Sequence, residues 1–149
     1  MRISNVQVRC LVVFAAIFHA TLVIADGTNV NDGVVKLAGS RLQLEEHDQI
    51  CHVINLSSTK KSQMYSLEIP WPCNFHKNRS GEVRIIRNGK YEYLLVEAST
   101  PVPDSHDCET HLRAIRATGK KAYISEYKDK VASCPPFQWD KLVFTELFR

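Results

Sequence analysis

The sequence has few of the residues that mark repetitive or disordered chains. Six Gly and six Pro occur among its 149 residues, with no internal repeat and no long low-complexity tract. Hydrophobic residues make up 44% and charged residues 23%, which excludes a wholly disordered chain, a coiled coil and a collagen. The length is sufficient for one ordinary domain and not for two.

Motifs that identify common enzyme classes are also missing. The chain has no G-x-S-x-G elbow, P-loop, H-E-x-x-H motif or dinucleotide fingerprint. No two cysteines have the C-x-x-C spacing of zinc sites and thioredoxin-like redox centres. We therefore expect no cofactor and no metal, and we favour a non-enzymatic protein.

The first 25 residues form a separate segment. Arg2 and Arg9 precede an apolar run over residues 10–25, which ends in Val23-Ile24-Ala25 before Asp26. This pattern predicts a secretory signal peptide over residues 1–25. A single-span anchor is the alternative, but it needs about 20 apolar residues, more than this run provides.

Cleavage of this leader would change the charge of the chain. The full chain has a net charge of +3, and the loss of Arg2 and Arg9 leaves +1. A nucleic-acid partner needs a dense basic surface, so we expect none. Residues 26–35 are polar and predict a flexible N-terminal arm before a single globular domain over residues 36–149. The expected location is the periplasm or the outside of the cell, without stable membrane insertion after cleavage.

The remaining cysteines are Cys51, Cys73, Cys108 and Cys134. An even number in an exported chain predicts two disulfides. Three connectivities are open. Cys51–Cys73 with Cys108–Cys134 is favoured because each bond closes a short loop, and each loop would stabilise the fold by roughly 3 kcal/mol.

Alternating polar and apolar residues predict strands through most of the domain. These strands cover residues 41–45, 50–56, 64–69, 82–87, 90–97 and 120–128. Residues 108–117 fit a strand or a helix, and the strand is favoured. A short helix that covers the core is predicted within residues 137–148, with Pro136 near its first turn. The expected fold class is mainly β, a small antiparallel sandwich, barrel or α+β roll with a C-terminal helix.

Asn88-Gly89 is the strongest local signal, because Asn-Gly between two strand-like runs predicts a tight hairpin. A two-residue turn there would pair Arg87 with Lys90 and Ile85 with Glu92. One face would then hold Val83, Ile85, Leu94 and Val96, and the other Ile86, Tyr91, Tyr93 and Leu95. Because both faces are apolar, we expect the hairpin inside a sheet.

The histidines outside the leader are candidates for chemistry: His47, His52, His76, His106 and His111. His106 and His111 are an odd number of residues apart, so on a strand they point to opposite faces and suit a shared metal poorly. His52 and His76 would approach each other if Cys51 pairs with Cys73, and either could act as a general base. Surface histidines without a catalytic role are the simpler interpretation.

A binding site is predicted directly after the predicted strand over residues 64–69. Trp71 stands between Pro70 and Pro72, which cannot donate to a strand ladder, and Cys73 follows. An aromatic residue on a rigid loop is typical of protein-recognition sites. The predicted binding residues are Trp71, Phe75, His76, Lys77 and Arg79, and the alternative is that Trp71 packs in the core.

A second basic group, Arg113, Arg116, Lys120 and Lys121, could meet an acidic partner or could be a solvated face.

These features predict an exported, disulfide-stabilised and non-enzymatic protein-binding module whose partner is another protein. A leader followed by a small four-cysteine β-rich domain is similar in architecture to many periplasmic or secreted inhibitors and immunity-type proteins. The alternatives are a small secreted hydrolase with a histidine general base and a structural or assembly factor of the envelope. A cleft in which a histidine hydrogen-bonds to an acid would favour the hydrolase.

Overall fold

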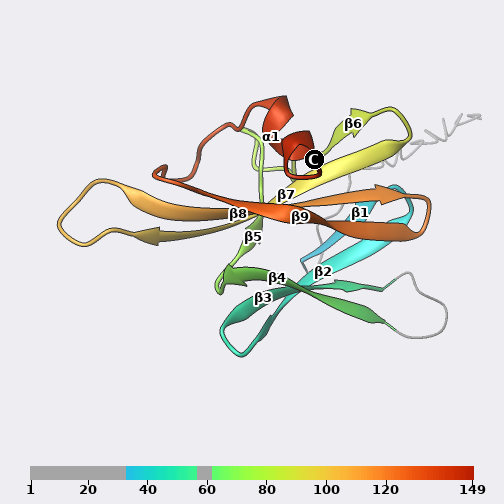
Figure 1. The fold of residues 1–149 in the computed structure, drawn as a ribbon, viewed down its shortest axis with the longest axis horizontal. Coiled ribbons are helices and arrows are strands. Elements are labelled where there is room, and N and C mark those ends of the chain that lie inside the picture. Colours follow the sequence, from blue (N-terminus) through green and yellow to red (C-terminus); the bar gives the residue numbers. More distant parts are fainter. Residues whose placement is uncertain (1–32, 57–61) are drawn as a thin grey trace, which may run out of the picture.

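A computed structural model of the chain describes residues 33–56 and 62–149. The predicted signal peptide and residues 26–32 of the predicted arm lie outside this part. The described chain forms two antiparallel sheets and one short C-terminal helix, so the prediction of a mainly β fold is confirmed (Figure 1).

The first sheet is a four-stranded meander in the order β1-β2-β3-β4. Its strands are β1 (Val34–Leu37), β2 (Ser40–His47), β3 (Ile50–Asn55) and β4 (Gln63–Pro70). The strand β1 begins at Val34, so the last two residues of the predicted arm are in the sheet. Val35 is buried and pairs with Leu42 of β2, because a β-branched residue gains more from this packing than from solvent.

The second sheet contains five strands. They are β5 (Asn74–Phe75), β6 (Ile86–Asn88), β7 (Tyr91–Pro101), β8 (Cys108–Thr118) and β9 (Lys121–Val131). The order is β5-β7-β8-β9, and β6 also pairs with β7. Residues 108–117 are therefore a strand, as favoured, because both faces of β8 are covered by other parts of the molecule.

The predicted Asn-Gly hairpin forms, but its register differs from the prediction. Asn88 pairs with Tyr91 and Arg87 with Glu92, so the turn residues are Gly89 and Lys90. Gly89 is the first central residue of this turn and has a φ of 59°. Type II′ turns need a positive φ at this position.

The predicted faces of this hairpin are confirmed on β7. The register shift moves the pairing by two residues, and an even shift leaves every side chain on its original face. Leu94 and Val96 therefore pack toward the first sheet, and Tyr93 and Leu95 pack on the opposite side. Ile85 is the exception, since it lies outside the short β6 and is exposed.

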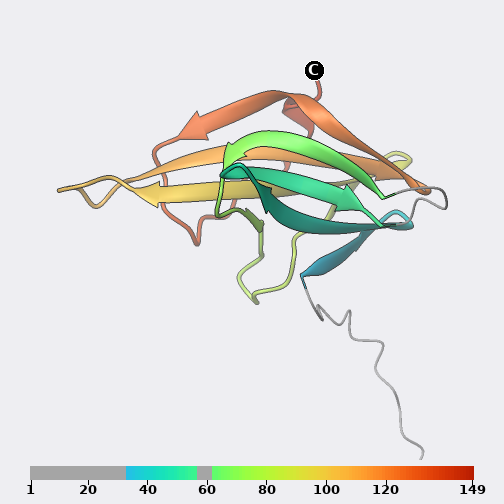
Figure 2. The same ribbon diagram turned by 90° about the horizontal axis from the view of Figure 1, so that it is seen from below.

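Two apolar clusters divide the molecule into three layers, which Figure 2 shows from below. One cluster fills the space between the sheets, with Leu42, Leu67 and Ile115 fully buried. The other joins the far face of the second sheet to the helix α1 (Lys141–Glu146) through Leu95, Phe144 and others. The prediction that the C-terminal segment covers the core is therefore confirmed.

The helix α1 is shorter than predicted and does not start near Pro136. It begins after Asp140, whose carboxylate accepts a hydrogen bond from Leu142 N at 2.8 Å. Asp is a strong N-cap because its side chain satisfies a backbone donor that the first helical turn leaves free. No helix in the described part of the chain has the length and apolar character to cross a membrane.

The disulfides are Cys51–Cys73 and Cys108–Cys134, which confirms the favoured pairing. Cys51 and Cys73 are buried in the cluster between the sheets. Cys108 begins β8, and Cys134 is exposed in the segment that leads to α1. This second bond ties the C-terminal segment to the loop end of the β7–β8 hairpin, which projects from the body of the molecule (Figures 1 and 2).

Candidate binding recess

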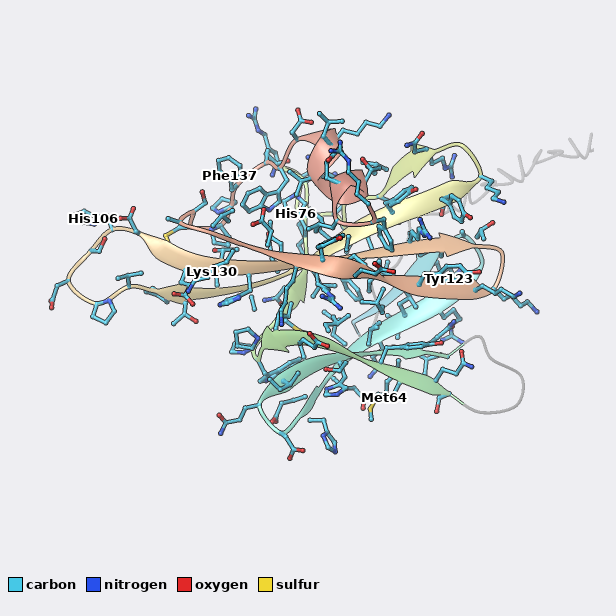
Figure 3. All side chains as sticks on the ribbon, in the orientation of Figure 1. Met64, His76, His106, Tyr123, Lys130 and Phe137 are labelled. Atoms are coloured by element: carbon cyan, nitrogen blue, oxygen red, sulfur yellow. A yellow bond between two sulfur atoms is a disulfide. The ribbon has the colours of Figure 1, made fainter. Side chains whose placement is uncertain are left out.

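A recess of about 910 Å³ opens beside β5, on the side of the second sheet that faces the C-terminal segment. Three parts of the chain form it: residues 72–81, the end of β7, and residues 135–138. Figure 3 shows His76 and Phe137 near each other on this side of the sheet. The lining residues that the argument uses are Phe75, His76, Lys77, Arg79, Glu97 and Phe137.

A compact turn carries the basic side chains of the recess. Asn78 Oδ1 accepts hydrogen bonds from the backbone N of Ser80 and of Glu82, each at 3.0 Å. This is the local bond that Asn side chains favour in turns. The backbone N–H of Arg84 donates to His76 O at 2.9 Å, so the chain after the turn runs back beside the residues that follow β5. Lys77 and Arg79 are exposed on this turn.

The floor of the recess is a hydrogen-bonded group of three side chains. His76 Nδ1 lies 3.2 Å from Glu97 Oε2, and Trp139 Nε1 donates to the same oxygen at 3.0 Å. His76 is 1% exposed and packs edge-on against Phe144 at 6.1 Å between ring centroids. One carboxylate oxygen thus connects β7, the residue that follows β5 and the C-terminal segment.

Further contacts hold the C-terminal wall against the turn. Arg84 donates to Trp139 O, and its guanidinium lies 5.2 Å from the centroid of the Phe144 ring. Gln138 Nε2 donates to Lys77 O at 3.3 Å. The Phe137 ring packs against that of Trp139 in a tilted arrangement, with 4.7 Å between the ring centroids, and Phe137 is still 45% exposed. The wall is therefore fixed on its inner side and presents an aromatic ring on its outer side.

The structure brings together four of the predicted binding residues. Phe75 and His76 lie at the buried floor, and Lys77 and Arg79 lie on the turn above it. Trp71 does not line the recess. It is 39% exposed, belongs to neither apolar cluster, and donates its backbone N–H to Gln49 O at 2.9 Å.

Sequence reasoning missed Glu97 and Phe137. Glu97 stands at the end of an apolar run, where a charged residue with an inward-facing side chain needs a partner, and this was the available signal. Phe137 was assigned to the helix that covers the core, and the extended segment before Asp140 places it on the recess instead.

The other candidate histidines are not assembled with His76. His52 faces away from the core on β3, where its ring lies 5.4 Å from that of His47. His106 is in the exposed tip of the β7–β8 hairpin, and His111 Nε2 lies 2.9 Å from Glu109 Oε1. In residues 33–56 and 62–149, no three His, Cys, Asp or Glu side chains form a group suited to a metal ion.

The second basic group is divided between the two faces of β8. Arg113 is buried on the side of the first sheet and donates to Glu126 O at 3.3 Å. Arg116 lies on the opposite side, where its guanidinium is 4.5 Å from the centroid of the Phe148 ring. The four residues therefore do not form one surface, because successive odd and even positions of a strand point to opposite faces.

Comparison of the chain with known protein families, curated protein sequences and solved structures finds no match. The function is therefore argued from the recess.

Proposed function

We propose that the protein is exported and serves as a non-enzymatic protein-binding module of the inhibitor or immunity type, with the recess as its contact surface. The observation that carries the proposal is an open recess of about 910 Å³ with Lys77, Arg79 and the 45% exposed Phe137 at its surface. Arginine and aromatic residues are enriched in protein interfaces and dominate their binding energy.

The walls of the recess are held in place before any partner arrives. The Cys51–Cys73 bond precedes β5, and the Cys108–Cys134 bond precedes the wall at residues 135–138. The Glu97 carboxylate joins the floor to that wall. A rigid site loses less conformational entropy on binding, so more of the contact energy remains as affinity.

Charge indicates the kind of segment that the recess would accept. Lys77 and Arg79 are exposed, and Glu97 is the single acidic residue of the lining. The Glu97 carboxylate already accepts one hydrogen bond from Trp139 and lies in hydrogen-bond contact with His76. The partner is therefore expected to present an acidic segment with an apolar side chain that contacts Phe137.

A capture experiment tests this function. The purified protein, immobilised and exposed to the envelope and secreted fractions of its source cells, is compared with Lys77→Glu/Arg79→Glu. Lys36→Glu/Lys120→Glu is the matched control, because it makes the same charge change at exposed positions of β1 and of the β8–β9 turn, outside the recess. We expect one protein to be retained by the wild type and the control and lost from the recess variant. Retention of the same proteins by all three would contradict the proposal.

Export is tested on the native protein by intact-mass spectrometry. The expected mass lacks residues 1–25 and the four hydrogens that two disulfides remove. Because thiols are kept reduced in the cytosol, alkylation of all four cysteines without a reductant would show that the protein does not reside in an oxidising compartment.

A hydrolase is the second candidate, and the contact between His76 and Glu97 favours it. A carboxylate 3.2 Å from Nδ1 is the arrangement that orients a histidine general base. Against this role, His76 Nε2 is shielded from solvent and has no hydrogen-bond partner among the described residues. Hydrolysis of p-nitrophenyl acetate by the wild type that is lost in His76→Gln and kept in Lys77→Gln would favour the hydrolase over the binding module.

A further inference from the structure

The outer face of the second sheet is only partly covered by α1. Toward the turns at Gly89 and Gly119, this face contains Arg116, the third residue from the end of β8. Tyr93 and Tyr123 are its cross-strand partners on β7 and β9. Figure 3 shows Tyr123 at this end of the sheet, away from the recess.

Three aromatic rings surround the Arg116 guanidinium. Its carbon Cζ lies 4.5 Å from the ring centroid of Phe148, 5.0 Å from that of Tyr91 and 5.6 Å from that of Tyr123. These distances are within the range of cation–π attraction. Stacking on several rings restricts the guanidinium to one orientation, so its N–H groups point in directions determined by the fold.

The Arg116 side chain has no hydrogen-bond acceptor in the described part of the chain. Its Nε is buried and unpartnered, although buried polar groups are paired in most proteins. Other arginines near this sheet do have acceptors: Arg84 donates to Trp139 O and Arg87 to Glu92 Oε1. A guanidinium carries five N–H donors, so the Nη groups of Arg116 retain capacity for two oxygen atoms of one oxyanion.

The surroundings of Arg116 are positive. Lys90 Nζ lies 5.3 Å from the Tyr91 ring centroid, and Lys121 is exposed at the start of β9. Two acids on the neighbouring segments β7 and α1 are engaged elsewhere. Glu92 bonds to Ala38 N and Arg87, and Glu146 pairs with Arg149. A ligand that approaches this face therefore meets cations without a competing carboxylate.

We propose that Arg116, with the rings of Tyr91, Tyr123 and Phe148, forms a binding position for the sulfate, phosphate or carboxylate group of an anionic ligand. The planar fork of Arg116 donates two parallel hydrogen bonds to the oxyanion, and Lys90 and Lys121 attract it from a longer distance. The position is separate from the recess and does not depend on the function proposed for it.

An NMR titration of the ¹⁵N-labelled protein with sodium sulfate, at constant ionic strength with sodium chloride as the balance, tests this site. We expect saturable shifts of the Arg116 Nε–Hε signal and of the Tyr91 and Tyr123 amides. Arg116→Lys keeps the charge and removes the fork, so sulfate should bind about tenfold more weakly. Arg41→Lys makes the same change at an exposed position of β2, outside both proposed sites, and should bind as the wild type does. Shifts that do not saturate, or equal binding by Arg116→Lys and the wild type, would overturn the proposal.

A second variant keeps the test valid if Arg116→Lys does not fold. Tyr123 is 41% exposed, so Tyr123→Ala should fold. The variant removes one of the three rings around Arg116 and should bind sulfate more weakly. Unchanged sulfate binding by Tyr123→Ala would contradict a role of the aromatic rings in this site.

Heparin oligosaccharide distinguishes a polymeric ligand from a free ion. Tighter binding of heparin than of sulfate, reduced in Lys90→Gln/Lys121→Gln, would assign the site to an anionic polymer. Equal affinity for the two would assign it to a small oxyanion. Heparin shifts that map to Lys77 and Arg79 alone would reject the Arg116 site.

Discussion

His76, which directly follows β5, and Glu97 of β7 are connected by a contact of 3.2 Å between Nδ1 and Oε2. The same Glu97 oxygen accepts a hydrogen bond from Trp139 Nε1 at 3.0 Å. Two donors from distant parts of the chain therefore depend on one largely buried carboxylate. This relationship determines the floor of the recess and the position of the C-terminal wall.

Replacement of Glu97 by Leu should destabilise the fold more than an exposed glutamate does. His76 and Trp139 would lose their shared acceptor, and a buried unsatisfied donor costs about 1–3 kcal/mol. Urea unfolding measures the difference. Glu45→Leu, at an exposed position of β2, is the control and should change stability by less than about 0.5 kcal/mol. Equal losses in the two variants would show that the Glu97 contacts do not stabilise the fold.

The two disulfides should differ in how readily they are reduced. Cys134 is exposed, whereas both Cys51 and Cys73 are buried. Because thiol–disulfide exchange needs access to a sulfur atom, a mild reductant should open Cys108–Cys134 first. Alkylation followed by peptide mass spectrometry identifies the open pair. Prior opening of Cys51–Cys73 would contradict the burial argument.

Removal of the Cys108–Cys134 bond should lower stability under non-reducing conditions. The bond spans 26 residues, and Cys108→Ser/Cys134→Ser should lower the free energy of unfolding by about 3 kcal/mol in the chain-entropy model. Unchanged unfolding of this double variant in urea would show that the bond does not constrain the unfolded chain.

Trp71→Ala should have only a small effect on stability. The side chain is 39% exposed and lies outside both apolar clusters. Surface substitutions of this kind change stability by about 0.5 kcal/mol or less. A thermal melt is the measurement. A large fall in the melting temperature would show that Trp71 packs in the core after all and would remove it from the candidate contact residues.

Acid should weaken the contact between Glu109 and Lys130. The hydrogen bond from Lys130, at 2.8 Å, and then that of His111 hold the pKa of the Glu109 carboxyl below its usual value. A lowered pKa in the folded state stabilises the fold above the pKa of the unfolded chain, and this contribution is lost as pH falls through the folded value. A ¹³C NMR titration should show a higher Glu109 midpoint in Lys130→Met than in the wild type. Identical midpoints would exclude Lys130 as the cause.

The register of the Asn88-Gly89 hairpin is not predicted correctly by its local sequence pattern. The dipeptide correctly predicts a turn, but the pairing of Arg87 with Glu92 differs from the prediction. That pairing allows Arg87 Nε to donate to Glu92 Oε1 at 2.8 Å, while the other Glu92 oxygen accepts from Ala38 N of the first sheet. Both registers would place the same side chains on the same faces of the hairpin. The register that forms coincides with contacts to residues outside the hairpin, which a local sequence pattern does not show.

The sequence by itself was sufficient for the strands β2, β3, β4, β7, β8 and β9, the two-faced pattern of β7, the covering C-terminal segment and the favoured disulfide pairs. These features depend on alternation along the chain, on cysteine parity and on short loops, which are local properties. The sequence did not predict β1 or β5, and of the predicted strand over residues 82–87 only Ile86 and Arg87 lie in β6. The tertiary structure alone decided that Glu97, Phe137 and the turn at Lys77 and Arg79 share a recess, and that Arg113 and Arg116 face opposite ways. Such groupings arise from packing between segments that are distant in sequence, where burial and shared hydrogen bonds, and not local propensity, determine the outcome.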